Sequence, residues 1–131
     1  MYRVLKPGGV LRIVVPDTAK AIAAYVQQDT RFLSQRLQTW RTWPMDCTML
    51  EGFLHYSGAP RSPGGAISGH KYGYDYETLA KLLTQVGFGA VARSDYMKSS
   101  IADLRVDDRS AVAKASFALD QYYSLFVEAT A

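Results

Sequence analysis

A short apolar segment enclosed by turn-forming residues constrains the fold of this 131-residue chain most strongly. Residues 9–15 read Gly-Val-Leu-Arg-Ile-Val-Val, with Lys6-Pro7-Gly8 before them and Pro16-Asp17 after them. A short run rich in β-branched residues predicts a strand, and a nearly continuous apolar run is typical of a strand covered on both faces in a parallel sheet. Arg12 is the one polar interruption. We therefore expect an α/β domain.

Helical patterns follow this strand. Pro16-Asp17 can start a helix whose alanines favour helical backbone, and Asp29-Thr30 predicts a break with a new N-cap. Apolar spacing predicts two further helical segments, one from this cap to about Thr42 and one at 46–56. Residues 57–73 carry many Gly and Pro residues and are expected to form a loop.

The clearest helical pattern begins after Asp75, a good N-cap residue. It ends before Gly87, which suits the left-handed backbone that often ends a helix. Strands are expected at 88–96 and 122–129. The pattern of residues 97–115 favours neither helix nor strand, and the pair Asp107-Asp108 within it is expected to lie in a loop. A regular apolar stripe predicts the buried side of the helix: Leu79, Leu82, Leu83 and Val86.

Three motifs in this order resemble the later part of a class I S-adenosylmethionine-dependent methyltransferase. Leu5-Lys6-Pro7-Gly8-Gly9 is similar to the turn that leads into the family's fifth strand. Tyr74–Leu79 with Val86-Gly87-Phe88 is similar to its last helix and sixth strand, and Ser124–Ala129 to its seventh. The resemblance implies a partial Rossmann-like fold of about three strands with helices, spanning residues 1–131 as one domain.

The resemblance also implies transfer of a methyl group from S-adenosylmethionine to an unknown acceptor. The family binds its cofactor on a glycine-rich turn after the first strand and on an acidic residue after the second. This sequence has no Gly-x-Gly-x-Gly motif, so we expect a C-terminal half that lacks the cofactor-binding half. As an isolated chain it is expected to bind S-adenosylmethionine weakly or not at all and to be inactive.

Four residues are candidates for the acceptor pocket: Asp17, His70, Tyr72 and Tyr74. Asp17 ends the first strand, where open α/β sheets place their ligands, and a histidine can act as a general base near neutral pH. Each residue also has a structural interpretation, as a helix N-cap for Asp17 and as ordinary loop packing for the others. No catalytic residue is assigned.

Other polar residues fit structural roles better than chemical ones. His55 lies among apolar neighbours, and Cys47 lacks a basic neighbour that would lower its thiol pKa. Asp103, Asp107 and Asp108 have no histidine close in sequence, so no metal site is expected. A nucleic-acid-binding module is the least favoured alternative, because Arg31, Arg36 and Arg41 do not share one helical face.

Composition limits the remaining function classes. A net charge of +3 is too small to indicate nucleic acid, and no apolar run approaches the roughly 20 residues of a membrane helix. The sequence starts without a secretory signal pattern, so a cytoplasmic location is expected. An unpaired apolar edge at Val10–Val15 would favour a homodimer or a partner chain that supplies the missing half. A non-enzymatic dimerisation or interaction module is therefore the alternative to an enzyme.

Overall fold

The structure is a computed structural model that describes residues 2–32, 48–50, 53, 72–109 and 123–131. The chain divides into two compact units. One consists of Met1–Asp17 together with Tyr74–Ala131, and the other of Thr18–Gly73. The first unit contains the sheet.

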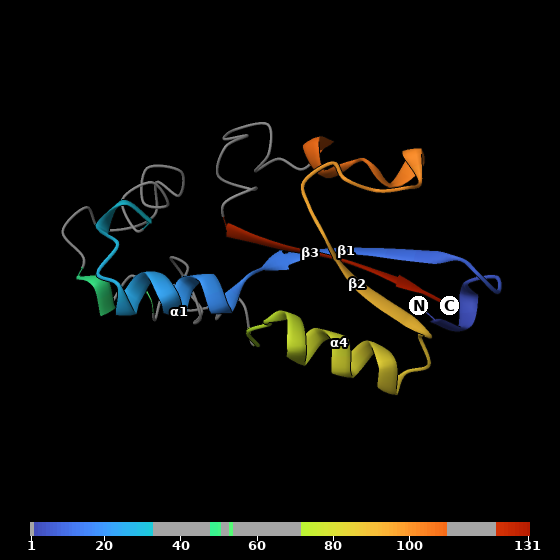
Figure 1. The fold of residues 1–131 in the computed structure, drawn as a ribbon, viewed down its shortest axis with the longest axis horizontal. Helices are drawn as coiled ribbons and strands as arrows, with labels where there is room; N and C mark the ends of the chain where they lie inside the picture. Colours follow the sequence, from blue (N-terminus) through green and yellow to red (C-terminus); the bar gives the residue numbers. More distant parts are fainter. Residues whose placement is uncertain (1, 33–47, 51–52, 54–71, 110–122) are drawn as a thin grey trace, which may run out of the picture. The chain divides into compact units, whose positions relative to one another are not determined.

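The sheet has three strands: β1 (Val10–Pro16), β2 (Ala90–Ser94) and β3 (Ser124–Thr130). Their order is β1-β3-β2, and β3 is antiparallel to both neighbours (Figure 1). The prediction of an α/β chain with about three strands is confirmed. The expected parallel pairing is wrong for both hydrogen-bonded pairs, because an apolar pattern reports how a strand is covered and not the direction of its neighbour.

The buried strand is β3 and not β1. Val127 at its centre is fully buried, and Leu125 and Ala129 point to the same face of the sheet. The expectation that residues 9–15 are covered on both faces is only partly right: Val14 is 41% exposed, whereas Arg12 on the same face is buried. β1 also lies at an edge of the sheet. Pro16 agrees with this position, because proline inside a sheet is confined mainly to edge strands and strand ends.

Helix α4 (Tyr76–Gln85) covers one face of the sheet over β2 and β3. The Asp75 carboxylate accepts a hydrogen bond from the Thr78 N–H at 2.8 Å, which confirms the predicted N-cap. Gly87 follows the helix at φ +112°, as the sequence predicted. Leu79 and Leu83 join the core, whereas Leu82 is 40% exposed and Val86 57% exposed, so half of the predicted buried stripe is wrong.

The N-terminal residues reach the end of this helix. A short 3-10 helix, η1 (Tyr2–Val4), precedes the Lys6-Pro7-Gly8-Gly9 turn, which the Gly9 N–H closes on the Lys6 carbonyl at 2.8 Å. The Tyr2 ring meets the Phe88 ring edge-on, with 5.2 Å between their centroids. The segment before β1 therefore lies on the same face of the sheet as α4.

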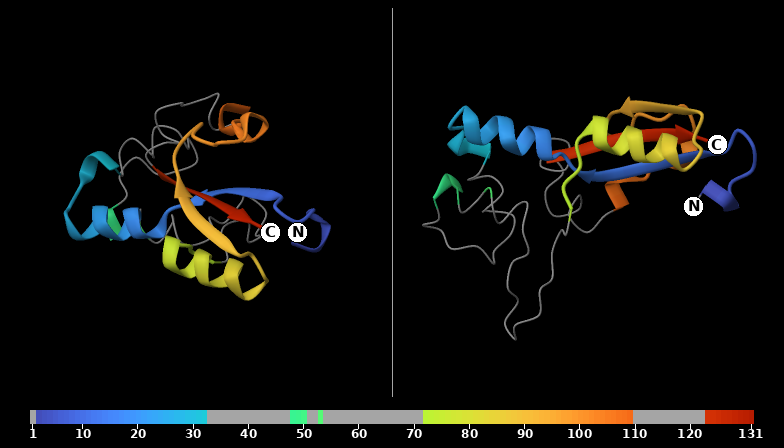
Figure 2. Two further views of the ribbon diagram at one scale, coloured as in Figure 1. Left: turned by 45° about the vertical axis from the view of Figure 1, so that its right-hand side comes forward. Right: turned by 90° about the horizontal axis from the view of Figure 1, so that it is seen from below.

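Residues 95–109 lie over the opposite face of the sheet, with the 3-10 helices η2 (Ala102–Leu104) and η3 (Asp107–Arg109) (Figures 1 and 2). The strand register places Arg12 beside Glu128, and Phe126 beside Ser94, on this face. The Tyr96 ring contacts the Phe126 ring edge-on, with 6.1 Å between centroids. Both faces of the central strand are therefore covered.

The second unit begins with α1 (Thr18–Val26), whose small residues Ala21 and Ala24 are buried. The helix is followed by Gln28 at φ 56°, and the Asp29 carboxylate accepts a hydrogen bond from the Phe32 N–H at 3.0 Å. The predicted break and new cap at Asp29-Thr30 are confirmed. Of the helix predicted from this cap to about Thr42, the structure describes residues 30–32, which are helical, and the rest lies outside the described residues. Of the segment predicted at 46–56, the structure describes three helical residues: Met49, Leu50 and Phe53.

Candidate functional site

The best-formed candidate site lies where β1 ends. Asp17 is 2% exposed, and its backbone N–H donates to the Tyr123 carbonyl at 2.8 Å, which continues the pairing of β1 with β3. An isolated parallel bridge joins Asp17 to Tyr74, the residue before the Asp75 cap of α4. The end of β1 and the start of α4 therefore meet at this pair of residues.

The structure brings together two of the four predicted pocket residues. Asp17 and Tyr74 are neighbours, and Tyr74 is half-buried against the core that α4 forms with the sheet. Tyr72 is exposed and belongs to the other unit. His70 lies outside the described residues, as do His55, Cys47, Arg36 and Arg41. Of the four candidate pocket residues, the described part of the chain therefore places one aspartate beside one tyrosine.

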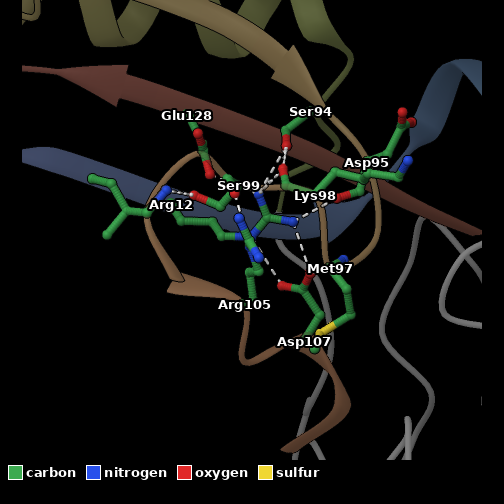
Figure 3. Close-up of polar contacts among 10 residues, drawn as sticks. Arg12, Ser94, Asp95, Met97, Lys98, Ser99, Arg105, Asp107 and Glu128 are labelled. Carbon is green, nitrogen blue, oxygen red and sulfur yellow. Dashed lines mark hydrogen bonds and ion pairs between the residues drawn. The ribbon is translucent and has the colours of Figure 1, made fainter. Parts of the chain in front are cut away.

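Sequence analysis missed a second polar cluster, which surrounds Arg12 (Figure 3). The Arg12 and Asp107 side chains are 4% and 3% exposed. The guanidinium donates from Nε to Asp107 Oδ1 at 3.0 Å and from NH2 to Asp107 Oδ2 at 2.7 Å. It also donates from NH1 to Glu128 Oε1 and to Ser94 Oγ, each at 2.9 Å. Two parallel hydrogen bonds between guanidinium and carboxylate make a charge-assisted pair of the stronger kind.

Backbone carbonyls complete the surroundings of Arg12. The Lys98 carbonyl accepts from NH1 at 3.3 Å and the Asp95 carbonyl from NH2 at 2.6 Å. An arginine has five N–H donors, and these six contacts engage all three guanidinium nitrogens. The Met97 N–H donates to Asp107 Oδ2 at 2.6 Å. The guanidinium is therefore committed to internal partners and is not a free anion-binding group.

Charge and burial act together on the acid–base properties of this cluster. The hydrogen bond from Arg12 to Asp107 is the main reason why the pKa of Arg12 is raised, and burial opposes that shift. Burial alone would raise the pKa of Asp107, but the hydrogen bonds from Arg12 and the Met97 amide, with the arginine's charge, bring it below its usual value. Both groups are held in their charged forms.

The Arg12 cluster also explains why one of two neighbouring aspartates in residues 95–109 is buried. Asp107 is buried as the partner of Arg12, whereas its neighbour Asp108 is exposed. Residues 2–32, 48–50, 53, 72–109 and 123–131 contain no group of three or more His, Cys, Asp or Glu that could hold a metal ion. One sequence signal could have identified the cluster: an arginine inside an apolar strand needs a buried carboxylate opposite it.

The glycines in the described part of the chain do not fit the cofactor that the family resemblance implies. A cofactor-binding glycine turn follows a strand and opens a helix. Among the glycines that the structure describes, Gly8 and Gly9 precede β1, and Gly87 and Gly89 lie between α4 and β2. Gly73 comes shortly before the Asp75 cap of α4, but it follows no strand within the described residues. No step of a reaction is therefore assigned here to a cofactor bound by these residues.

No helix in the described part of the chain is both long enough and apolar enough to span a membrane. Comparison with known proteins adds no relative: no family model, curated protein or solved structure matches the chain.

Proposed function

We propose that this chain is the C-terminal, acceptor-side part of a class I S-adenosylmethionine-dependent methyltransferase. The motifs at Leu5–Gly9 and Val86–Phe88 carry the resemblance, and the geometry of the sheet supports it. β1 and β2 run in the same direction, since each is antiparallel to β3, and the chain between them contains α1 and α4. A helix-bearing connection between strands of one direction is the basic unit of doubly wound folds, which often include an antiparallel strand.

The single observation that carries the proposal is the pairing of Asp17 with Tyr74 at the carboxyl end of β1. Open α/β sheets bind their ligands at the carboxyl ends of strands. In this proposal the carboxylate of Asp17 orients the methyl acceptor through a hydrogen bond, and the Tyr74 ring forms part of the pocket wall. The contribution to the reaction is alignment, which brings the acceptor atom into line with the methyl group.

A partner supplies S-adenosylmethionine in this proposal, because the described glycines do not form its binding turn. The partner is a polypeptide that carries a glycine-rich strand-turn-helix, in the same assembly as this chain. When bound, the cofactor provides an electrophilic methyl group. The pocket residues of this chain then act only on the acceptor.

Two measurements test the proposal. Isothermal titration of the 131-residue chain with S-adenosylmethionine should give no measurable heat, and adding the polypeptide with the glycine-rich turn should restore binding. Transfer of a labelled methyl group to a panel of acceptors should then require both components. Low-micromolar binding by this chain alone would show that the assignment of the cofactor to the partner is wrong.

The variant Asp17→Asn tests the assigned pocket. In the two-component assembly it should raise KM for the acceptor and leave the affinity for S-adenosylmethionine unchanged. A matched control is Asp95→Asn, whose side chain lies on the segment that covers the opposite face of the sheet. Equal effects of both variants on KM would contradict the role given to Asp17.

A second candidate function is a non-enzymatic interaction module, acting as a homodimer or with a partner chain. The edge position of β1 favours it, because an unpaired strand edge invites pairing with another chain. The two candidates differ in one outcome. An assembly that forms normally but transfers no methyl group to any acceptor of the panel would favour the interaction module.

A further inference from the structure

Among the strands that the structure describes, β2 forms one outer edge of the sheet. The N–H and C=O groups along such an edge can pair with a strand of another chain, which leads to aggregation. Natural proteins protect these edges with short strands and with charged side chains. β2 has five residues, and the charged residue Arg93 lies next to its last one. The edge of β2 therefore has two of the known protective features.

The pairing pattern shows which backbone groups of β2 lie at this edge. β3 bonds to β1 at odd-numbered positions, since the Asp17 N–H continues the pairing by donating to the Tyr123 carbonyl. Bonded residues alternate along an antiparallel strand, so the even-numbered positions of β3 bond to β2. In the register these positions pair with Ala90, Ala92 and Ser94. The N–H and C=O groups of Val91 and Arg93 therefore point to the outer edge.

A side chain of α4 bonds to one of these outward groups. The Tyr76 hydroxyl donates a hydrogen bond to the Val91 carbonyl at 3.0 Å. Tyr76 is half-buried and packs against the core between α4 and the sheet, so its ring is held in place. A further strand would need the same carbonyl as an acceptor for its own N–H. The Tyr76 hydroxyl therefore competes with strand addition at Val91.

Arg93, the second outward residue, contacts the same tyrosine. Its guanidinium carbon lies over the Tyr76 ring, 4.6 Å from the ring centroid, a distance at which a cation and an aromatic face attract each other. The pKa of Asp75 is lowered mainly by hydrogen bonding to Thr78, and the positive charge of Arg93 contributes in the same direction. The guanidinium is thus held at the start of α4, across the ring that bonds to Val91.

We propose that Tyr76 and Arg93 form an edge lock that closes the outer edge of β2 to a second copy of this chain. Two antiparallel β2 strands centred on Ala92 would place Val91 of each copy opposite Arg93 of the other. Both Arg93 side chains would then lie on one face of the joined sheet, where like charges repel. The hydroxyl and the charge therefore oppose the same pairing by different means. This inference goes beyond the proposed function, because it concerns self-association and not methyl transfer.

Two double variants of the full 131-residue chain test the edge lock. Tyr76→Phe with Arg93→Thr keeps the aromatic ring and removes the hydroxyl and the charge. Tyr2→Phe with Arg3→Thr makes the same chemical changes at exposed residues of η1. In sedimentation equilibrium the first variant should lower the dimer dissociation constant about tenfold or more relative to the parent, and the second less than about twofold. Equal dissociation constants for the two variants would contradict the proposal.

Hydrogen exchange locates the association. The amides of Val91 and Arg93 should exchange rapidly in the parent monomer and become protected in the associated Tyr76→Phe/Arg93→Thr variant. Association of this variant without new protection of these two amides would overturn the proposal, since the copies would then meet elsewhere. Protection of both amides in the parent monomer would overturn it too, because another part of the chain would then cover the edge. Neither test uses S-adenosylmethionine, so a failure here leaves the proposed function to its own experiments.

Discussion

Arg12 and Asp107 are 95 residues apart in sequence and are joined by two hydrogen bonds, from Nε to Oδ1 and from NH2 to Oδ2. Arg12 belongs to β1, whereas Asp107 begins η3. The pair therefore ties the segment of residues 95–109 to the sheet on the face opposite α4. Because the segment also places the Asp95 and Lys98 carbonyls on the same guanidinium, one arginine fixes three points along it.

Removing the carboxylate should destabilise the protein strongly. In the variant Asp107→Ala the buried guanidinium loses two hydrogen bonds, and breaking a buried ion pair by removing one partner costs about 3–5 kcal/mol. Urea unfolding followed by circular dichroism measures the change. The matched variant Asp108→Ala removes the adjacent exposed carboxylate and should stay within about 0.5 kcal/mol of the parent. Similar losses in the two variants would contradict the structural role of Asp107.

Acid should weaken the fold through the same carboxylate. The pKa of Asp107 is lower in the folded protein than its ordinary value, so the unfolded chain takes up the proton first as the pH falls. The stabilisation from Asp107 is fully present above about pH 4, the ordinary value for aspartate, and is lost as the pH falls through the lower folded pKa. Asp75, whose pKa is lowered mainly by hydrogen bonding to Thr78, acts in the same direction.

A variant makes this pH dependence measurable. Asp107→Asn cannot take up that proton, so it should be less stable than the parent at neutral pH. Its stability should then fall less steeply when the pH is lowered below about 4. The measurement is the urea midpoint of both proteins at a series of pH values. Parallel pH profiles for the two proteins would show that Asp107 does not carry the effect.

Alanine substitutions in the apolar stripe of α4 should differ in how much they lower the free energy of unfolding. Leu83 is buried among core residues, so Leu83→Ala should cost about 2–5 kcal/mol, as removal of a buried leucine side chain usually does. Leu82 is 40% exposed, so Leu82→Ala should cost less, about 1 kcal/mol or below in the isolated chain. Thermal unfolding of both variants decides between this division and a stripe that is buried throughout.

Local elements could be predicted from the sequence because short-range rules control them. The cap at Asp75, the left-handed backbone at Gly87 and the break at Asp29 each depend on a few neighbouring residues. The burial of Leu82 and Val86 could not be predicted in the same way. Helical spacing defines an apolar sector, but the width of the covered sector depends on what packs beside the helix.

The candidate site was only partly predictable for a related reason. Asp17 was accessible to prediction because it ends an obvious strand, and the structure places it beside Tyr74. The hydrogen-bonded pair of Arg12 and Asp107 could not be predicted, because the two residues are 95 positions apart and no local rule selects Asp107 from the other acidic residues. The antiparallel position of β3 was equally hidden, because strand pairing is a long-range property of the chain.

The glycines that follow α4 provide the last prediction. Gly87 has φ +112°, and a Cβ built there would lie 3.0 Å from the Tyr2 ring. Gly87→Ala should therefore combine backbone strain with crowding against an aromatic side chain, and a residue held in an unfavourable backbone region costs about 1–3 kcal/mol. Tyr2 should also move away from Phe88.

Gly89 is the matched control, because a Cβ there meets nothing within 4 Å and its backbone is not left-handed. Gly89→Ala should leave stability unchanged or raise it by about 0.4–1 kcal/mol, since alanine restricts the unfolded chain. Urea unfolding of both variants gives the difference. If Gly87→Ala were as stable as Gly89→Ala, the backbone at the end of α4 would not need a left-handed residue, and Tyr2 would not be held against it.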